Sequence, residues 1–377
     1  MSNDYDYGAE SIQVLKGLEA VRRRPGMYVG NTDDGSGLHN MVYEVLDCAL
    51  EEARAGYGDR IALTIHGDRE ITVEDRGRGI PVDVCHGYEV PYVEVVLTTL
   101  FAGGMFDRSS YSIGSGLHGV GLPAVNALSE HLTADVFRDG AHWRQRHERG
   151  EPCGPLERLG GTSNTGTRVR FCADTEIFVD PVFEFDVLAE RLEALAWMYP
   201  EVVFELFDHR DDRHVSFHSP GGMVEALVGD RGAEDVVYAC ATHDGVVVEL
   251  ALRPTRWVDT LRTFANGLET PRHGTHLLGL QRALHDVFLA DSGRPWREVF
   301  DKNGIGGASI LRESFDVMLH VFVPDTRYTG ATKCELASVE ATEAVAQVAT
   351  PALEAWVRER GQSVDRVFEQ WSSSASW

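Results

Sequence analysis

Apolar residues recur at three- and four-residue spacing between Leu38 and Arg54, which predicts a helix with one buried face. That face consists of Leu38, Met41, Val42, Val45, Leu46, Ala49 and Ala53. A second, polar face carries Glu44, Asp47, Cys48 and Glu51. A carboxylate on a helix that is anchored by its opposite side can serve as a general base. On these residues alone, however, an amphipathic helix with a solvated acidic face is the simpler interpretation.

The patterns along the rest of the chain alternate between strands and helices. Strands are predicted at 60–66, 69–75, 132–140, 141–148, 166–174, 201–208, 214–219, 236–243, 245–254, 261–267 and 314–325. Helices are predicted at 11–24, 38–54, 90–100, 122–130, 186–200, 276–292 and 338–360. A Ser-Pro-Gly-Gly cluster at 219–222 marks a domain boundary. We therefore predict an α/β fold with a first domain at 1–220, whose mixed sheet is covered by helices on one side, and a smaller α/β domain at 221–377.

Two glycine-rich segments are candidate ligand contacts. Asp75 ends a predicted strand and is followed by Gly77 and Gly79, where the backbone can closely approach a flat ligand. The long tract at 101–121 opens onto the predicted helix at 122–130. Glycines at a helix N-terminus expose backbone N–H groups that can bind a phosphate. The tract is also compatible with a lid over a site, or with an ordinary flexible surface loop.

Composition excludes several classes of function. The net charge of −24 repels phosphate backbones, so DNA binding by this chain alone is not expected. The six cysteines form no CxxC pair, which predicts reduced thiols and neither a structural zinc site nor a disulfide framework. The longest apolar runs are too short to cross a membrane, and the first residues lack the features of a signal peptide. We therefore predict a cytoplasmic protein.

Four segments together resemble a known family. Glu44, the sequence DRGRG at 75–79, GLHGVG at 116–121 and the pair Gly166-Thr167 are similar, in order and spacing, to the four sequence boxes of the GHKL ATPases. The segments VLKGLEAVRRRPGMYVG, LFAGGMFD, GTHLLG and VPDTRYTGATK extend the resemblance to the ATPase and transducer region of the gyrase B group. The resemblance implies a GHKL (Bergerat) ATP-binding sandwich, followed by a transducer domain similar to domain 2 of ribosomal protein S5.

The resemblance also implies roles for individual residues. Glu44 would orient and deprotonate the water that attacks the γ-phosphate of ATP, and Lys333 would contact that phosphate. Asp75 would accept the adenine amino group, and the Thr167 hydroxyl would support the same ring. The implied ATP-binding set is Asp75, Arg78, Gly79, Ile80, Gly103, Gly104, Gly116, Leu117, His118, Gly119, Val120, Gly121 and Thr167.

Two further contacts are implied by the same resemblance. Tyr7 and Ile12 match the arm, residues 1–14, that embraces the partner protomer when ATP closes a homodimer. Arg78 and Arg138 fall where the family binds aminocoumarin inhibitors of gyrase.

Four positions depart from the family pattern. Cys48 replaces the asparagine that ligates Mg²⁺, and a thiol is a soft ligand poorly matched to this hard cation. Met105 replaces a lysine, Ala331 a glutamine and Asn40 a histidine. The chain also ends before the metal-binding (TOPRIM) domain with which the family cleaves DNA. We therefore expect ATP as a ligand and weak or redirected hydrolysis without DNA cleavage, and the use of Mg²⁺ stays open.

Three functions are compatible with the sequence. The first is a gyrase-B-like ATP-binding protein that dimerises on nucleotide. The second is an enzyme that transfers phosphate from ATP to a small-molecule substrate, because one fold can serve many functions. The third is a non-catalytic decoy for gyrase inhibitors, or a regulator that pairs with gyrase subunits.

Overall fold

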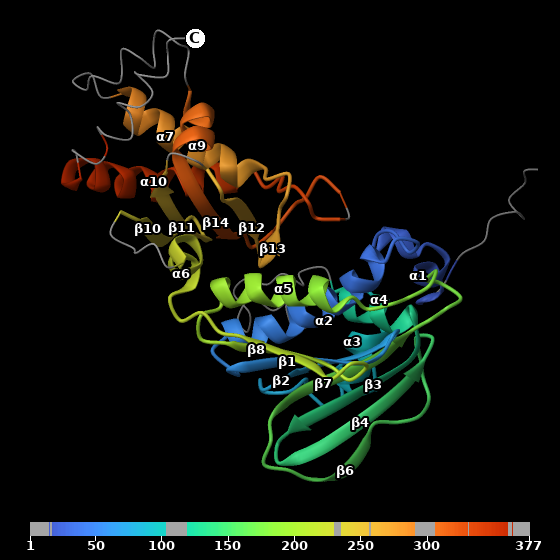
Figure 1. The fold of residues 1–377 in the computed structure, drawn as a ribbon. Coiled ribbons are helices and arrows are strands. Elements are labelled where there is room, and N and C mark those ends of the chain that lie inside the picture. Colours follow the sequence, from blue (N-terminus) through green and yellow to red (C-terminus); the bar gives the residue numbers. More distant parts are fainter. Residues whose placement is uncertain are drawn as a thin grey trace, which may run out of the picture.

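The structure, a computed structural model, describes residues 15, 17–102, 119–229, 235–255, 258–290, 306–330, 332–360 and 364. Within these residues the chain forms two sheets, each with helices against it (Figure 1). The predicted α/β class is confirmed. Some predicted site residues and departures lie outside the described residues: Tyr7, Ile12, Gly103, Gly104, Met105, Gly116, Leu117, His118 and Ala331.

The first sheet is mixed and has nine strands in the described part of the chain, in the order β5-β4-β3-β7-β2-β1-β8-β9, with β6 beside β4. Its strands are β1 (Arg60–Gly67), β2 (Glu70–Asp75), β3 (Ser129–Arg138), β4 (Ala141–Glu148), β5 (Glu151–Pro152), β6 (Glu157–Gly161), β7 (Gly166–Ala173), β8 (Val203–Asp208) and β9 (Arg213–Phe217). Strands β1 and β8 run parallel, and β2 pairs antiparallel with β1 and β7. The short strands β5 and β6 were not predicted, because they are mostly exposed and show no alternation of apolar and polar residues.

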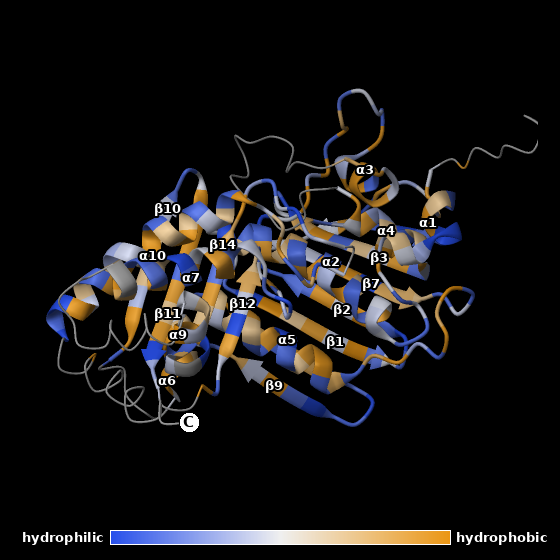
Figure 2. Ribbon diagram, turned by 90° about the horizontal axis from the view of Figure 1, so that it is seen from above, coloured by the Kyte–Doolittle hydropathy of each residue, from blue (hydrophilic) through white to orange (hydrophobic). Residues whose placement is uncertain are grey.

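Helices cover one face of this sheet, as predicted (Figure 1). They are α1 (Glu19–Arg23), the 3-10 turn η2 (Pro25–Met27), α2 (Ser36–Arg54), α3 (Tyr92–Thr98), α4 (Gly121–Ala127) and α5 (Phe185–Met198). Seen from the helical side in Figure 2, α2 and α5 lie over the strands of the first sheet. Helix α4 ends three residues before its predicted end, because Ser129 already begins β3.

Helix α2 buries the predicted apolar stripe. Leu38, Met41, Val42 and Leu46 are fully buried against the sheet, and Ala53 packs at the margin of the core. Asp47, which was predicted on the polar face, is 1% exposed, so this part of the face is buried and not solvated. Asp47 and Glu44 both line a cavity between the two halves of the chain. In an α-helix of 3.6 residues per turn, Asp47 is rotated by about 60° from Glu44. This rotation turns it toward α5 and the second sheet, whereas Glu44 and Cys48 line a cavity beside the end of β2.

The second sheet has five strands in the described residues, in the order β10-β11-β14-β12-β13. They are β10 (Val237–His243), β11 (Val246–Pro254), β12 (Leu261–Ala265), β13 (Leu268–Glu269) and β14 (Phe315–Phe322). The helices of this half are α6 (Gly222–Val228), α7 (Thr275–Ala290), α9 (Gly307–Ser314) and α10 (Glu340–Glu359). Strand β14 is buried along nearly its whole length, because it lies between β11 and β12 and under α7 and α9.

The two halves pack on each other through the inner face of the second sheet. Phe264 and Met318 of that sheet belong to the core that also holds Leu195 and Tyr199 at the end of α5. The Arg54 guanidinium lies 3.8 Å from the centroid of the Phe322 ring, a cation–π contact between the halves. The second half therefore packs directly against helices α2 and α5 of the first half. The domain boundary at 220 stays a prediction.

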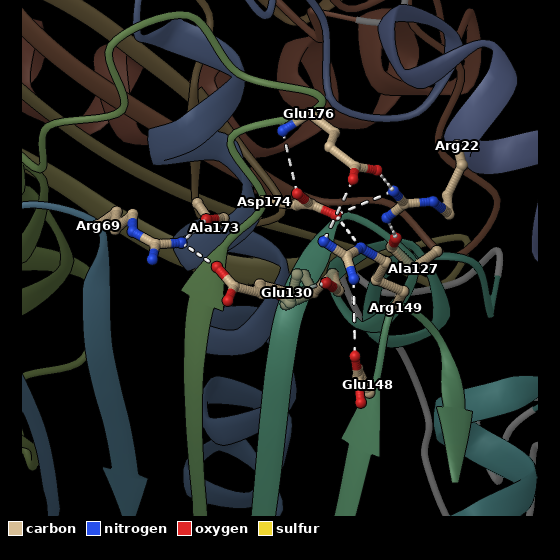
Figure 3. Close-up of polar contacts among 11 residues, drawn as sticks. Arg22, Arg69, Ala127, Glu130, Glu148, Arg149, Ala173, Asp174 and Glu176 are labelled. Carbon is tan, nitrogen blue, oxygen red and sulfur yellow. Dashed lines mark hydrogen bonds and ion pairs between the residues drawn. The ribbon is translucent and has the colours of Figure 1, made fainter. Parts of the chain in front are cut away.

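Helix α1, which follows the predicted arm, is fixed to the first sheet by a cluster of ion pairs (Figure 3). Arg22 donates to the Ala127 carbonyl (2.8 Å) and to the buried Asp174 carboxylate (2.9 Å), and Arg149 donates to the same carboxylate (2.9 Å). Burial alone would raise the pKa of Asp174, but the Glu176 N–H and both guanidinium groups outweigh it and lower that pKa. Helix α1 is therefore held at the C-terminal end of α4.

All six cysteines lie within the described residues and none is paired, in agreement with the prediction of free thiols. No helix among the described residues is long and apolar enough to cross a membrane. The cytoplasmic location stays a prediction.

Candidate functional site

A cavity of about 330 Å³ opens between α2, the end of β2, the start of α4 and the start of β7. Ten of the predicted residues line it: Glu44, Cys48, Asp75, Arg78, Gly79, Ile80, Gly119, Gly121, Arg138 and Thr167. Val120, also predicted, is not part of the lining and precedes α4 as its N-cap. Residues that the motifs identified on separate elements therefore meet in one cavity.

One region of the cavity is organised around Asp75, at the end of β2. Burial raises the pKa of this carboxyl from 3.8 to about 7, although the N–H groups of Gly77 and Thr167 act in the opposite direction. The Gly77 N–H donates to Asp75 Oδ1 over 2.7 Å. The Thr167 hydroxyl accepts the Ile80 N–H (3.1 Å), so its own hydrogen can point elsewhere. The region thus offers an acceptor and a donor that suit a flat polar ring.

Two backbone segments, at Gly79 and at Gly166, approach each other closely at this end of the cavity. Gly79 has φ +80°, and a Cβ there would lie 2.9 Å from the Phe137 carbonyl and 3.0 Å from the Gly166 carbonyl. A Cβ on Gly166 would lie 2.0 Å from the Asp75 carbonyl oxygen. Contacts this short are impossible for a side chain, so both positions require glycine.

Two arginines form the rim near Asp75. Arg78 makes a bidentate ion pair with Glu52, with distances of 3.0 and 2.8 Å, and stacks over the Tyr57 ring at 4.1 Å. Arg138 donates to the Gly79 carbonyl over 2.7 Å. Glu52 was not predicted as a site residue. It follows Glu44 by eight residues on the same helix, and this spacing was the signal that could have identified it.

A second region of the cavity is organised around Glu44. Lys333, which comes from the second half of the chain, places Nζ 3.0 Å from Glu44 Oε1. Burial disfavours the ammonium group, but attraction by Glu44 and then Asp47 outweighs it, so the pKa of Lys333 is raised. A Cβ on Gly121 would lie 2.2 Å from Glu44 Oε2, so a side chain at this position would displace the Glu44 carboxylate. The structure thus joins the two predicted catalytic residues, which are far apart in the sequence.

Cys48 lies one turn after Glu44 and lines the same cavity. Its Sγ lies 3.7 Å from the Glu44 carbonyl oxygen. Burial and the nearby carboxylates of Glu51, Asp47, Glu44 and Asp75 raise the pKa of this thiol well above its ordinary value, so it is neutral near pH 7. Among the described residues, no group of three His, Cys, Asp or Glu side chains could hold a metal ion. A neutral thiol beside a carboxylate that already pairs with Lys333 does not fit Mg²⁺.

Asn40, the second departure within the described residues, does not line this cavity. Its side-chain amide donates to the Val29 carbonyl over 2.8 Å, and so it braces the segment between η2 and α2. It lines a different cavity, between the two halves of the chain.

Comparison with known proteins assigns the chain to a family. Residues 33–177 match the family of histidine kinase-, DNA gyrase B-, and HSP90-like ATPases, and residues 222–376 match the DNA gyrase B family. The DNA gyrase B protein of Haloferax lucentense is 42% identical over 352 residues, which are 90% of this chain and 55% of that protein. The chain thus spans about half the length of the curated relatives that it matches.

Solved structures agree with this assignment. The 43K ATPase domain of Thermus thermophilus gyrase B, solved with an aminocoumarin, is 32% identical, with a TM-score of 0.74 over 96% of this chain and 95% of that one. The ATP-binding domain of topoisomerase IV from Francisella tularensis, with 24% identity and a TM-score of 0.78, shares the fold. This chain therefore belongs to the GHKL ATPases, in the group that contains the ATPase region of DNA gyrase B.

Proposed function

We propose that the cavity binds ATP and that the chain hydrolyses it slowly. The observation that carries the proposal is one cavity with a buried carboxyl, Asp75, in one region and Glu44 in another. Lys333, which lines the adjoining cavity, places its Nζ 3.0 Å from Glu44 Oε1. Glu52, which holds the Arg78 rim, lies eight residues after Glu44 on α2, or about 12 Å along the helix axis. That length suits a nucleoside triphosphate with adenine at Asp75 and the γ-phosphate at Glu44.

The chemistry follows from the positions of the side chains. Glu44 orients a water molecule and accepts its proton as the water oxygen attacks the γ-phosphorus, and ADP leaves with the electrons of the broken bond. Lys333 balances the negative charge of the phosphate from the opposite half of the chain. Because Lys333 belongs to the second half, the state of the phosphate affects how that half contacts α2. The proposed reaction therefore couples hydrolysis to the packing of the two halves.

Phosphate transfer to a small molecule and a non-catalytic role stay predictions from the sequence. The described residues hold no feature that favours either of them over hydrolysis by water.

Cys48→Asn is the first test of this proposal. An asparagine would provide the oxygen ligand that a neutral thiol lacks, without touching the apolar stripe of α2. We expect the magnesium-dependent rate of phosphate release to rise about tenfold or more, since one such interaction contributes upwards of roughly 1.4 kcal/mol to the barrier. Cys48→Ser, which adds a shorter oxygen group, is the matched control. An unchanged rate for Cys48→Asn would show that position 48 does not restrain hydrolysis.

Nucleotide should also promote a two-fold dimer through the predicted arm. Deletion of residues 1–14 removes Tyr7 and Ile12 but leaves the Arg22 cluster that fixes α1. We expect the shortened chain to stay folded and to bind a non-hydrolysable ATP analogue as a monomer, whereas the full chain dimerises. Light scattering with and without the analogue measures this difference, and a monomeric full chain with bound analogue would refute the dimer.

A further inference from the structure

Helix α2 forms the wall of the nucleotide cavity beside Glu44, and Cys48 follows Glu44 by one turn on that wall. Both residues line the cavity, and the Cys48 Sγ lies 3.7 Å from the Glu44 carbonyl oxygen. Sulfur is a soft ligand, whereas Mg²⁺ takes hard oxygen ligands in a near-octahedral arrangement. This mismatch holds whether or not the thiol carries its proton. Position 48 therefore offers Mg²⁺ no suitable ligand.

The carboxylate of Glu44 is already held by its surroundings. Its Oε1 accepts a hydrogen bond from Lys333 Nζ over 3.0 Å. Its Oε2 lies close to Gly121, where a Cβ would be only 2.2 Å away. A divalent cation bound to this carboxylate would lie next to the Lys333 ammonium group, and two cations that share one carboxylate repel each other. Glu44 therefore does not replace the missing ligand at position 48.

Two other carboxylates of the cavity wall are engaged as well. Glu52 accepts the N–H of Arg78 over 2.9 Å and its guanidinium over 3.0 and 2.8 Å. Asp75 Oδ1 accepts the Gly77 N–H over 2.7 Å. Glu51 is the fourth carboxylate of the lining, and it follows Glu44 by seven residues, or about 10 Å along the axis of α2. Within the described ranges, these side chains form no group of three that could hold one metal ion.

We propose that a divalent cation enters this cavity only as part of the nucleotide, and that it takes no ligand from α2 or from the other described walls. Phosphate oxygens and water are hard ligands, so they can complete the coordination of the cation without the protein. The inference rests on the proposed binding of ATP. It extends that proposal to the cation that accompanies the nucleotide.

The consequence is a lack of selectivity between divalent cations. Mg²⁺ and Ca²⁺ carry the same charge, but Ca²⁺ takes more oxygen ligands at longer distances. A protein oxygen bound to the cation would couple the affinity for the nucleotide to the identity of the cation. A wall without such an oxygen senses only the charge, which is the same for both.

The test is a calorimetric titration of a non-hydrolysable ATP analogue into the 377-residue chain, with saturating Mg²⁺ or saturating Ca²⁺ at constant ionic strength. We expect the two affinities of the wild type to agree within about twofold. Cys48→Ala should keep this ratio, whatever it does to the affinity itself, because it removes a side chain that is not a ligand. Cys48→Asn should shift the ratio toward Mg²⁺ by about fivefold or more, the lower range for coupling between two bound ligands.

Each ratio is measured within one protein, so an effect of the substitution on folding stability cancels. A wild-type ratio of about fivefold or more would overturn the inference. Loss of that ratio in Cys48→Ala or in Glu51→Gln would then identify the ligand. An unchanged ratio in Cys48→Asn would also count against the inference, because position 48 would then not control cation selectivity. Failure of the analogue to bind with either cation would refute the proposed function and this inference with it, whereas selective binding would refute the inference alone.

Discussion

Glu44→Gln should lower the rate of ATP hydrolysis by about 10²- to 10⁴-fold, the range for loss of a general base. Glutamine keeps the size of the side chain and one oxygen that can accept a hydrogen bond from Lys333, but it cannot take a proton from water. Nucleotide affinity should change by less than about threefold, because Asp75 and the glycine positions are untouched. Steady-state phosphate release and calorimetric titration of a non-hydrolysable analogue measure the two quantities separately.

Glu51→Gln is the matched control for Glu44→Gln. It makes the same chemical change two turns later on α2, at a residue that lines the same cavity. We expect it to retain hydrolysis within a factor of a few. Equal losses in both variants would mean that the general charge of this helix matters, and that Glu44 is not the base.

Asp75→Asn should have opposite effects on stability and on ATP binding. With a pKa raised from 3.8 to about 7, the folded chain holds a proton that the unfolded chain has released between these pH values. The free energy of unfolding therefore falls as the pH rises through this window, and nearly all of this loss of stability is present by pH 8. Asparagine removes that cost, so we expect the ligand-free variant to be about 2 to 4 kcal/mol more stable at pH 8. Its ATP affinity should fall by about 1 to 3 kcal/mol.

The stability difference for Asp75→Asn should vanish toward pH 4, and this pH dependence is the decisive measurement. Urea unfolding at pH 5 and pH 8 provides it. Both proteins will lose stability below about pH 6.5, because burial lowers the pKa of His147 to about 4 and those of His276 and His320 to about 3. The comparison is therefore made between the two proteins at each pH. A pH-independent difference, or equal ATP affinity, would contradict the assignment of Asp75.

The long elements were predictable because burial and periodicity agree in them. Helix α2 and strands β1 and β2 each present apolar residues at the spacing of their own geometry, so their existence and their buried faces follow from the sequence. The burial of Asp47 could not be predicted from the sequence, for a physical reason. Helical periodicity places its side chain between the apolar stripe and the Glu44 face, and only the packing of the second half on the first decides that it is buried.

The site was predictable in its residues but not in its contacts. Glu44, Asp75 and Thr167 were identified through motifs, and the fold brings them to one cavity. The pairing of Lys333 with Glu44 depends on how the two sheets dock, which no local pattern encodes.

The close backbone approach at Gly79 and Gly166 limits how this part of the chain can vary in sequence. Any substitution at either glycine drives a side chain into a carbonyl oxygen. The rim is different, because Arg78 and Arg138 present side chains that can change without moving the backbone. A ligand that drew its affinity from the glycine backbone would meet nearly the same surface in every variant, whereas one that relied on the rim arginines could be lost by a single codon change.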